Sequence, residues 1–201
     1  MHLYVEGGGD KNKSLQIACR KGFRQFLEKA GLKGHMPRIV ACGGRQQAYD
    51  DFCTALRQGK PAMLLVDSED AVATQSPWGH LLQRAGDGWP QPPESTDDHC
   101  HLMVQCMESW FLADRDTLRT FFDQGYNEKA LPSAERPIES LEKSSIYQAL
   151  SAATRACKTK APYNKGEHSF DLLSHVDPVK VAAASPWVDR LVKSVKMAMG
   201  I

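Results

Sequence analysis

Two carboxylates stand where predicted strands end, and they give the first indication of chemistry. Glu6 closes the alternating segment at residues 2–6 and precedes three glycines, and Asp67 follows the uninterrupted apolar run at residues 61–66. Open α/β sheets bind ligands outside the carboxyl ends of their strands, so both acids are expected at one edge. Carboxylates brought together there repel each other unless a cation compensates their charge. The pattern therefore predicts a divalent metal site, and Mg²⁺ or Mn²⁺ suits its oxygen donors.

The same residues have a local alternative, in which each acid caps the following helix or lies in solvent. The glycines favour the functional hypothesis, because Gly7 and Gly8 would let a phosphate backbone approach the turn closely. We therefore expect both glycines to contact substrate. Asp10 and Asp70 are expected to serve local turns or helix starts and to support the site only indirectly.

Glu108 is a further acidic candidate, just after a predicted strand at residues 101–105. If that strand adjoins the first one, Glu108 could reach the same metal or act as a general base for water. The alternative is a carboxylate at a helix N-terminus, where the helix macrodipole favours negative charge.

The basic segment at residues 158–167 supplies candidates of the opposite charge. Lys160 and Lys165 could pair with phosphates and stabilise charge that develops in phosphoryl transfer, and Tyr163 could stack on a base. His168 follows directly. The alternative for this segment is a solvated basic loop.

An alternation of strands and helices would position these residues. Apolar patterning predicts strands at residues 2–6, 37–42, 61–66 and 101–105. It predicts helices at residues 11–30, 43–58, 108–122 and 144–156, followed by short helices from residue 168 onward. Successive parallel strands joined by helices indicate an α/β fold with an open, mainly parallel sheet. We expect an α/β core over residues 1–122 and a helical cap over residues 123–201, packed as one compact unit.

Composition narrows the class of protein. The chain has 201 residues, 42% apolar and 24% charged, and a formal net charge of +1. Binding to nucleic acid would therefore need a local basic patch rather than a global field. No apolar run approaches the roughly 20 residues that span a bilayer, and the N-terminus has no signal-peptide pattern, so we expect a cytoplasmic protein without membrane contact. The six scattered cysteines predict reduced thiols rather than disulfides or a zinc ribbon.

The order of elements resembles the Toprim fold, which topoisomerases, primases and overcoming-lysogenization-defect nucleases share. The resemblance rests on VEGGG at residues 5–9 and LLVDSED at residues 64–70. It implies that Glu69 joins Glu6 and Asp67 as a metal ligand. The chain departs from the Toprim pattern because Glu69 stands where a second aspartate is usual, and its longer arm could alter the metal geometry.

Nearly the whole chain also resembles a bacterial family of unknown function, numbered forty-two seventy-six among such domains. Further matches are HLMVQCMESWFLAD at residues 101–114, YNKGEHSFDLL at residues 163–173 and the closing SPW. Members resemble Toprim-like proteins and are often encoded beside ABC- or AAA-type ATPases in apparent phage-defence loci. The resemblance implies a nuclease effector, and it favours functional roles for Glu108, Lys165 and His168.

The leading hypothesis is therefore a metal-dependent nuclease that cleaves DNA or RNA and works with an ATPase partner in anti-phage defence. Homo-oligomerisation is left open. Glu6, Asp67 and Glu69 would bind the metal, Glu108 would complete the site or activate water, and Lys165 would hold the scissile phosphate.

The alternative from another class is a catalytically silent sensor or adaptor that binds such an ATPase. Its contact residues would then be exposed tryptophans, with Trp78, Trp89 and Trp187 as candidates. A primase-like, nucleotide-processing activity ranks third, because residues 7–14 lack the glycine that a P-loop requires before Lys13.

Overall fold

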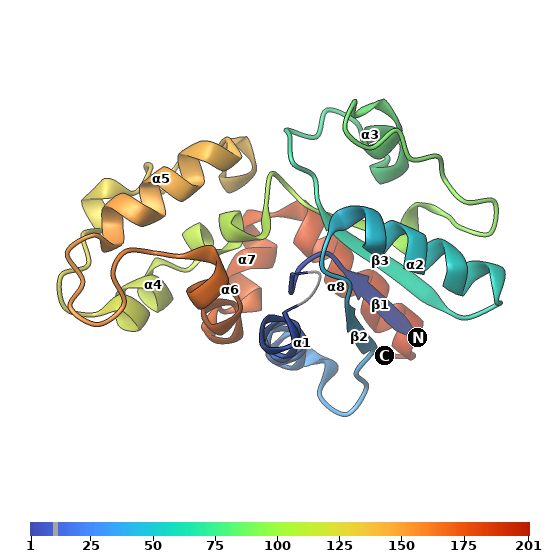
Figure 1. Cartoon of the computed structure of the whole chain (residues 1–201), viewed down its shortest axis with the longest axis horizontal. Coiled ribbons are helices and arrows are strands. Elements are labelled where there is room, and N and C mark those ends of the chain that lie inside the picture. The colour runs from blue at the N-terminus through green and yellow to red at the C-terminus, as the bar shows by residue number, and fades with distance from the viewer. Residues whose placement is uncertain (10–11) are drawn as a thin grey trace.

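The computed structural model describes residues 1–9 and 12–201. Within these residues, four parallel strands form one open sheet in the order β2-β1-β3-β4 (Figure 1). The strands are β1 (His2–Val5), β2 (Arg38–Ala41), β3 (Ala62–Asp67) and β4 (Cys100–Met103). The predicted α/β class is confirmed: the sheet is open and parallel, helices flank it, and the arrangement is consistent with a Toprim-like sheet.

The fourth strand adjoins the third rather than the first, contrary to the condition under which Glu108 was expected to reach the metal site. The register pairs Leu64 with Cys100 and Asp67 with Met103. The carboxyl end of β4 therefore lies beside Asp67, and the chain after β4 approaches the site from that side.

Helices cover both faces of the sheet, because alternate strand residues point to opposite sides. Leu3, Met63 and Leu65 belong to one apolar cluster with α1 (Lys13–Leu27), α6 (Lys165–His175) and α8 (Pro186–Met199). Leu64 and Val66 belong to a second cluster with α2 (Arg45–Arg57) and α3 (Pro77–Gln83). All six residues of β3 are buried, as the uninterrupted apolar run predicted.

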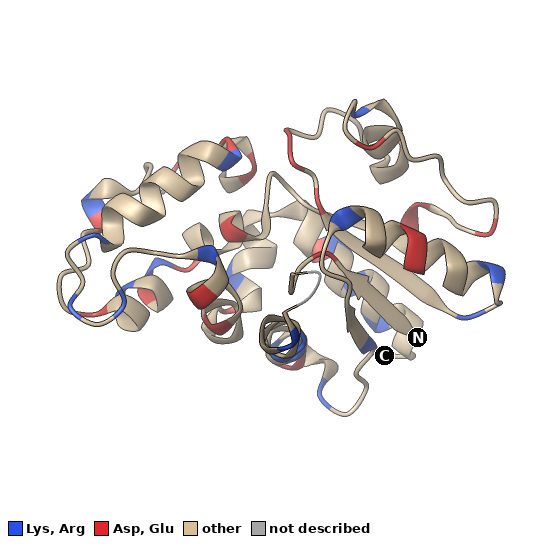
Figure 2. Ribbon diagram, in the orientation of Figure 1, with Lys and Arg blue, Asp and Glu red and all other residues tan. Residues whose placement is uncertain are grey.

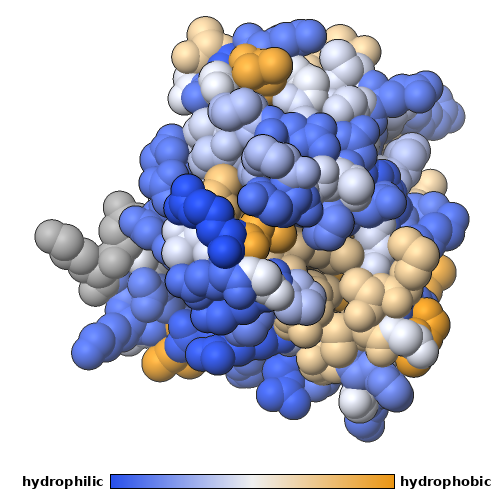
Figure 3. All heavy atoms as spheres, turned by 90° about the vertical axis from the view of Figure 1, so that its right-hand side faces the viewer, coloured by the Kyte–Doolittle hydropathy of each residue, from blue (hydrophilic) through white to orange (hydrophobic). Residues whose placement is uncertain are grey.

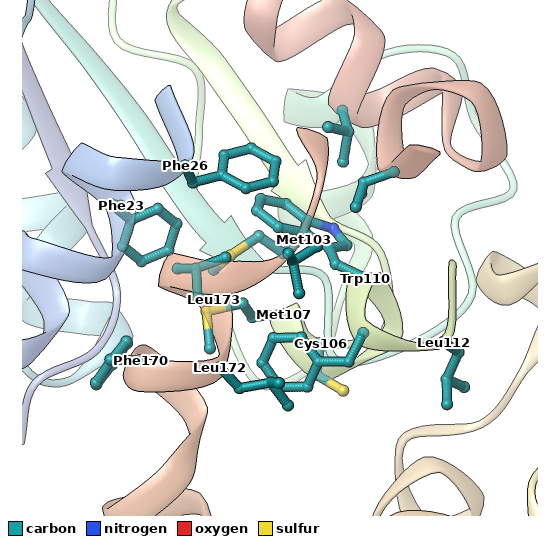
Figure 4. Close-up of a cluster of buried hydrophobic side chains, with 14 of the residues drawn as sticks. Phe23, Phe26, Met103, Cys106, Met107, Trp110, Leu112, Phe170, Leu172 and Leu173 are labelled. Carbon is teal, nitrogen blue, oxygen red and sulfur yellow. The ribbon is translucent and has the colours of Figure 1, made fainter. Parts of the chain in front are cut away.

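The larger cluster is centred on Trp110 (Figure 4). The Trp110 ring stacks on Phe26, with centroids 5.1 Å apart, and meets Phe23 edge to face at 6.3 Å. Such aromatic pairs add to the free energy of burial. Leu172 and Leu173 of α6 belong to the same cluster, so residues from both the predicted core and the predicted cap share one apolar interior.

The helix predicted over residues 108–122 is divided in two. A 3₁₀ helix spans Met107–Ala113, and α4 spans Arg115–Phe122. The break falls at Asp114, whose carboxylate accepts the backbone N–H of Thr117 and thereby caps α4.

The other helix limits differ less from the prediction. Helix α1 is followed directly by one π-helical turn over Glu28–Leu32, in which Gly31 has φ 96°. The predicted basic loop is shorter than expected at its end, because α6 already begins at Lys165. The remaining α-helices are α5 (Lys143–Thr154) and α7 (Pro178–Ala184), and further 3₁₀ turns lie at Asp97–His99, Glu128–Ala130 and Ile138–Ser140.

Among the helices of residues 1–9 and 12–201, none combines the length and the apolar character that a bilayer crossing requires. Figure 3 shows one face of the molecule, which is mostly hydrophilic, with hydrophobic surface gathered toward one side of its lower half.

Candidate metal centre

Adjacent strands bring the three predicted metal ligands together. Glu6 directly follows β1, and Asp67 is the last residue of the neighbouring strand β3. Glu69 lies two residues farther on, where a left-handed backbone (φ 65°) follows the end of the strand. One ligand atom from each carboxylate lies within 4.8 Å of the others. These three side chains could therefore hold a metal ion.

The donor set fits a hard divalent cation such as Mg²⁺, which prefers carboxylate oxygens. Only 4% of the Asp67 side chain is exposed, against 17% for Glu6 and 22% for Glu69. Backbone groups already orient two of the carboxylates: the Met107 N–H donates to Asp67 Oδ1 at 2.9 Å, and the Asp67 N–H donates to Glu6 Oε2 at 3.1 Å. These hydrogen bonds fix the orientation of the Glu6 and Asp67 carboxylates.

Burial disfavours the charged forms of Glu6 and Asp67. Burial, and then the charge of Asp67, raise the pKa of Glu6 to about 7. Burial also raises the pKa of Asp67, against the opposing effect of Lys143. A bound cation would favour the charged forms and lower both pKa values.

Arg45, which the sequence analysis missed, contacts all three ligands. Its Nη1 lies 3.3 Å from Glu6 Oε2, 2.8 Å from the Asp67 carbonyl oxygen and 3.5 Å from Glu69 Oε1. Asp87 holds the other side of the guanidinium through two hydrogen bonds of 2.7 and 2.6 Å. A signal did exist, because Arg45 follows Gly43-Gly44 after β2, at the same edge of the sheet as the acids.

Lys143 is the second residue that the sequence analysis missed. From the N-terminus of α5, its ammonium group donates to Asp67 Oδ2 at 3.1 Å and to Glu69 Oε1 at 2.7 Å. Burial opposes the charge of Lys143, but the two carboxylates outweigh burial and raise its pKa. No local pattern indicates this role, since Lys143 is 76 residues from Asp67 in the chain.

Glu108 lies beside the three carboxylates but has partners of its own. It is fully buried, and its two oxygens accept hydrogen bonds from the hydroxyls of Tyr147 (3.0 Å) and Tyr163 (3.1 Å). The Lys165 ammonium lies 3.8 Å from Glu108 Oε1 and 3.9 Å from Asp67 Oδ2, and it donates to the Tyr147 hydroxyl at 3.0 Å. Glu108 and Lys165 are thus both brought to the centre.

Tyr163 cannot stack on a base as expected, because its side chain is buried and its hydroxyl is committed to Glu108. Burial, and then the negative charge of Glu108, raise the pKa of the Tyr163 phenol, so it remains a hydrogen-bond donor. Tyr163 therefore contacts the centre through Glu108.

The structure does not bring Lys160 and His168 to the carboxylates. The Lys160 ammonium donates to the Phe121 carbonyl oxygen at 2.9 Å and lines a different cavity. His168 Nδ1 accepts the N–H of Asn164 at 2.9 Å, and its ring packs against Phe122. Their predicted contacts with substrate have no counterpart at the three carboxylates.

The glycines after Glu6 line a cavity of about 230 Å³, together with Asp67 and Lys165. Gly7 and Gly8 have backbone conformations that residues with a side chain rarely adopt, with φ 133° at Gly7 and 93° at Gly8. A Cβ atom at Gly7 would lie 2.9 Å from Cζ of Phe170. The packing of the turn therefore requires glycine, whether or not substrate enters the cavity.

Of the two acids given a supporting role, Asp70 stands apart from the three carboxylates. Asp70 is exposed, and its carboxylate accepts a hydrogen bond from Arg84 Nε at 2.9 Å. Asp10 lies outside the described residues.

The tryptophans proposed as exposed contact residues are largely internal. Trp78 and Trp89 are 2% and 4% exposed and belong to the second apolar cluster. Trp187 is partly buried against the same cluster. Trp78 and Trp89 therefore offer no exposed anchor for a partner.

A family model described as "Domain of unknown function (DUF4276)" matches residues 5–196. The chain belongs to the DUF4276 family. The DUF4276 match contains all four carboxylates of the centre and its three cations, Arg45, Lys143 and Lys165. No curated protein and no solved structure is significantly similar to this DUF4276 chain.

Proposed function

We propose that this DUF4276 protein is a nuclease that hydrolyses phosphodiesters with Mg²⁺ or Mn²⁺. The observation that carries the proposal is the meeting of three carboxylates from two strand ends within 4.8 Å, beside a cavity. A divalent ion bound there would activate water and neutralise charge on the phosphate. Glu6, Asp67 and Glu69 would hold the ion.

Lys165 is suited to holding the scissile phosphate. Its side chain is 53% exposed, lines the cavity, and has its ammonium within 4 Å of both Asp67 and Glu108. A lysine at this position can stabilise negative charge that develops on phosphate oxygens. Its hydrogen bond to Tyr147 orients the ammonium group.

Glu108 is better suited to positioning than to proton transfer. Both of its oxygens already accept phenolic hydrogen bonds, from Tyr147 and Tyr163. We therefore assign Glu108 to placing Tyr147, and through it Lys165, rather than to activating water. A role in anti-phage defence, under the control of an ABC- or AAA-type ATPase, rests on the family resemblance alone.

The test is cleavage of single-stranded DNA, duplex DNA and tRNA with Mg²⁺ or Mn²⁺. Glu6→Gln and Asp67→Asn should each lower the cleavage rate roughly 100-fold or more, because each removes a ligand charge. Asp70→Asn is the matched control, since it removes a neighbouring acid that faces Arg84, and it should leave the rate unchanged.

Calorimetric titration with Mn²⁺ separates this proposal from the adaptor alternative. The wild type should bind Mn²⁺, and Glu6→Gln should bind it at least about tenfold more weakly. Cleavage that survives both ligand substitutions would contradict the assigned site, and a wild type that binds no Mn²⁺ would favour a silent adaptor.

A further inference from the structure

A second hollow, of about 570 Å³, lies between α1 and the edge strand β2. We call it the α1–β2 groove. Its apolar lining includes Ile17, Met36 and Ile39. None of the described residues that line it is acidic, and four are cationic: Arg20, Lys21, Arg24 and Arg38.

The cations on α1 share one side of the helix. Positions 20 and 21 follow position 17 by three and four residues, and position 24 follows them by four and three. Their side chains therefore form one stripe, which faces β2. Helix α1 contains four basic residues and no acidic residue, although the whole chain has a net charge of only +1. Figure 2 shows α1 nearly end-on, with Lys and Arg in blue on its ribbon. The groove is therefore a local basic patch.

Most of these cations have no acidic partner among the described residues. Within residues 1–9 and 12–201, Arg20, Lys21 and Arg38 form no salt bridge, and Arg24 pairs only with Glu28 one turn farther along α1. Like charges that line one hollow repel each other, and a bound polyanion would remove that repulsion. Ile17 adds an apolar side chain that is 59% exposed, so the groove can also contact nonpolar groups.

One end of the groove lies near the glycine turn that follows Glu6. A Cβ atom at Gly8 would lie 3.0 Å from Gln16 Cα on α1 and 3.3 Å from Ala41 Cβ on β2. Gln16 directly precedes Ile17, and Ala41 lies two residues beyond Ile39, so Gly8 contacts α1 and β2 just outside the groove lining. Gly8 also lines the cavity beside Glu6 and Asp67. The glycine turn consequently lies between the near end of the groove and the cavity.

We propose that the α1–β2 groove binds single-stranded nucleic acid and leads it to the metal centre. The cations would contact phosphates, and the apolar lining would contact sugars and base faces, which a single strand exposes and a duplex conceals. From Ile17 to Arg24 the helix rises about 10 Å, room for a few nucleotides. The part of the proposal that leads the nucleic acid to the metal centre rests on the proposed nuclease function. Binding of nucleic acid in the groove does not require the metal.

Binding is measured by fluorescence anisotropy with labelled 12-nucleotide DNA and RNA strands in EDTA. Arg20→Glu/Lys21→Glu should weaken binding at least roughly tenfold at low salt and reduce its salt dependence. The matched control is Arg57→Glu/Lys60→Glu, which changes the net charge equally at exposed positions at the amino ends of the strands. The control should change affinity less than about twofold. Circular dichroism should show that both variants are folded.

Two outcomes would overturn the groove proposal directly: a wild type that binds neither labelled DNA nor labelled RNA, or equal losses of affinity in both double variants. A third is a groove variant that loses affinity for an acidic peptide but not for the nucleic acids. This third outcome would assign the groove to an acidic protein partner at the edge strand β2.

A separate variant distinguishes the groove proposal from the nuclease proposal. Glu6→Gln/Asp67→Asn should abolish cleavage and retain binding of the labelled nucleic acids. If the wild type binds strands through the groove but cleaves nothing, the nuclease proposal fails and the groove proposal stands.

Discussion

Individual charges decide how well the carboxylate cluster of Glu6, Asp67 and Glu69 could hold a metal ion. Glu6, Asp67 and Glu69 face Arg45 and Lys143, which already occupy several of the oxygens that a metal ion would use. A metal ion must therefore compete with the protein's own cations. This balance makes affinity sensitive to changes of one charge, even where the fold is unaffected.

Glu6 should make the metal-free protein less stable as the pH rises. The folded-state pKa of about 7 lies above the ordinary value of 4.5, so the folded state holds the proton more tightly than the unfolded chain does. The resulting stabilisation is complete below pH 4.5 and is lost as the pH rises through 7. We expect the free energy of unfolding in EDTA to fall by on the order of 2 kcal/mol between pH 5 and pH 8.

Urea unfolding at four pH values across this range tests the prediction. Glu6→Gln should flatten the decline, because its amide does not titrate, whereas Asp70→Asn should retain it. A decline of equal size in Glu6→Gln would assign the effect to another group.

At the scale of elements, close packing of α1 on α6 places Lys165 at the site. Gly22 lies in the middle of α1, where a Cβ atom would lie 2.5 Å from the carbonyl oxygen of Phe170. That carbonyl belongs to the backbone of α6, the helix that begins with Lys165. Glycine at this position lets the two helices approach closely.

Gly22→Ala should therefore destabilise the protein by about 1–3 kcal/mol, the usual cost of overpacking, although alanine is the better helix former. Gly79→Ala is the matched control in α3, where the nearest atom to the new Cβ would be 3.5 Å away. It should be neutral or stabilise by up to ~1 kcal/mol. Thermal unfolding of both variants checks this, and equal stability of Gly22→Ala and wild type would contradict the close approach.

At the scale of the whole molecule, the segment after residue 122 completes the centre that the sheet begins. Figure 1 shows α5 and α6 on the side of the sheet opposite the termini. These two helices carry Lys143, Tyr147 and Lys165. The site thus depends on how the helical segment packs against the sheet, and the charge of Lys143 links the two.

Lys143→Met should lower the melting temperature of the metal-free protein and raise its affinity for Mn²⁺. Without the ammonium group, Asp67 and Glu69 lose a compensating charge, and the ion no longer competes with it. We expect Mn²⁺ to bind roughly tenfold more tightly and to raise the melting temperature more than in the wild type. Lys158→Met, at an exposed lysine in the same segment, is the control. Weaker Mn²⁺ binding by Lys143→Met would show that Lys143 supports the ion rather than competing with it.

Local patterns were enough to predict the strands, most helices and the meeting of Glu6 with Asp67. A buried parallel strand needs apolar residues along its whole length, and its carboxyl end is set by chain direction, so residues 61–67 carry that information themselves. Helix limits were less predictable where one side chain decided them, as Asp114 did between the 3₁₀ helix and α4.

Amino-acid order alone determined the parallel sheet and the carboxylates at its edge, because these depend on the period of apolar residues and on chain direction. Only the tertiary structure decided that β4 lies beside β3 and that Arg45 and Lys143 compensate the acids. It also decided that Tyr163 is buried against Glu108 rather than exposed to a base. These contacts join residues 39 to 76 positions apart, and no local period specifies which distant side chains the packing of helices on the sheet will bring together.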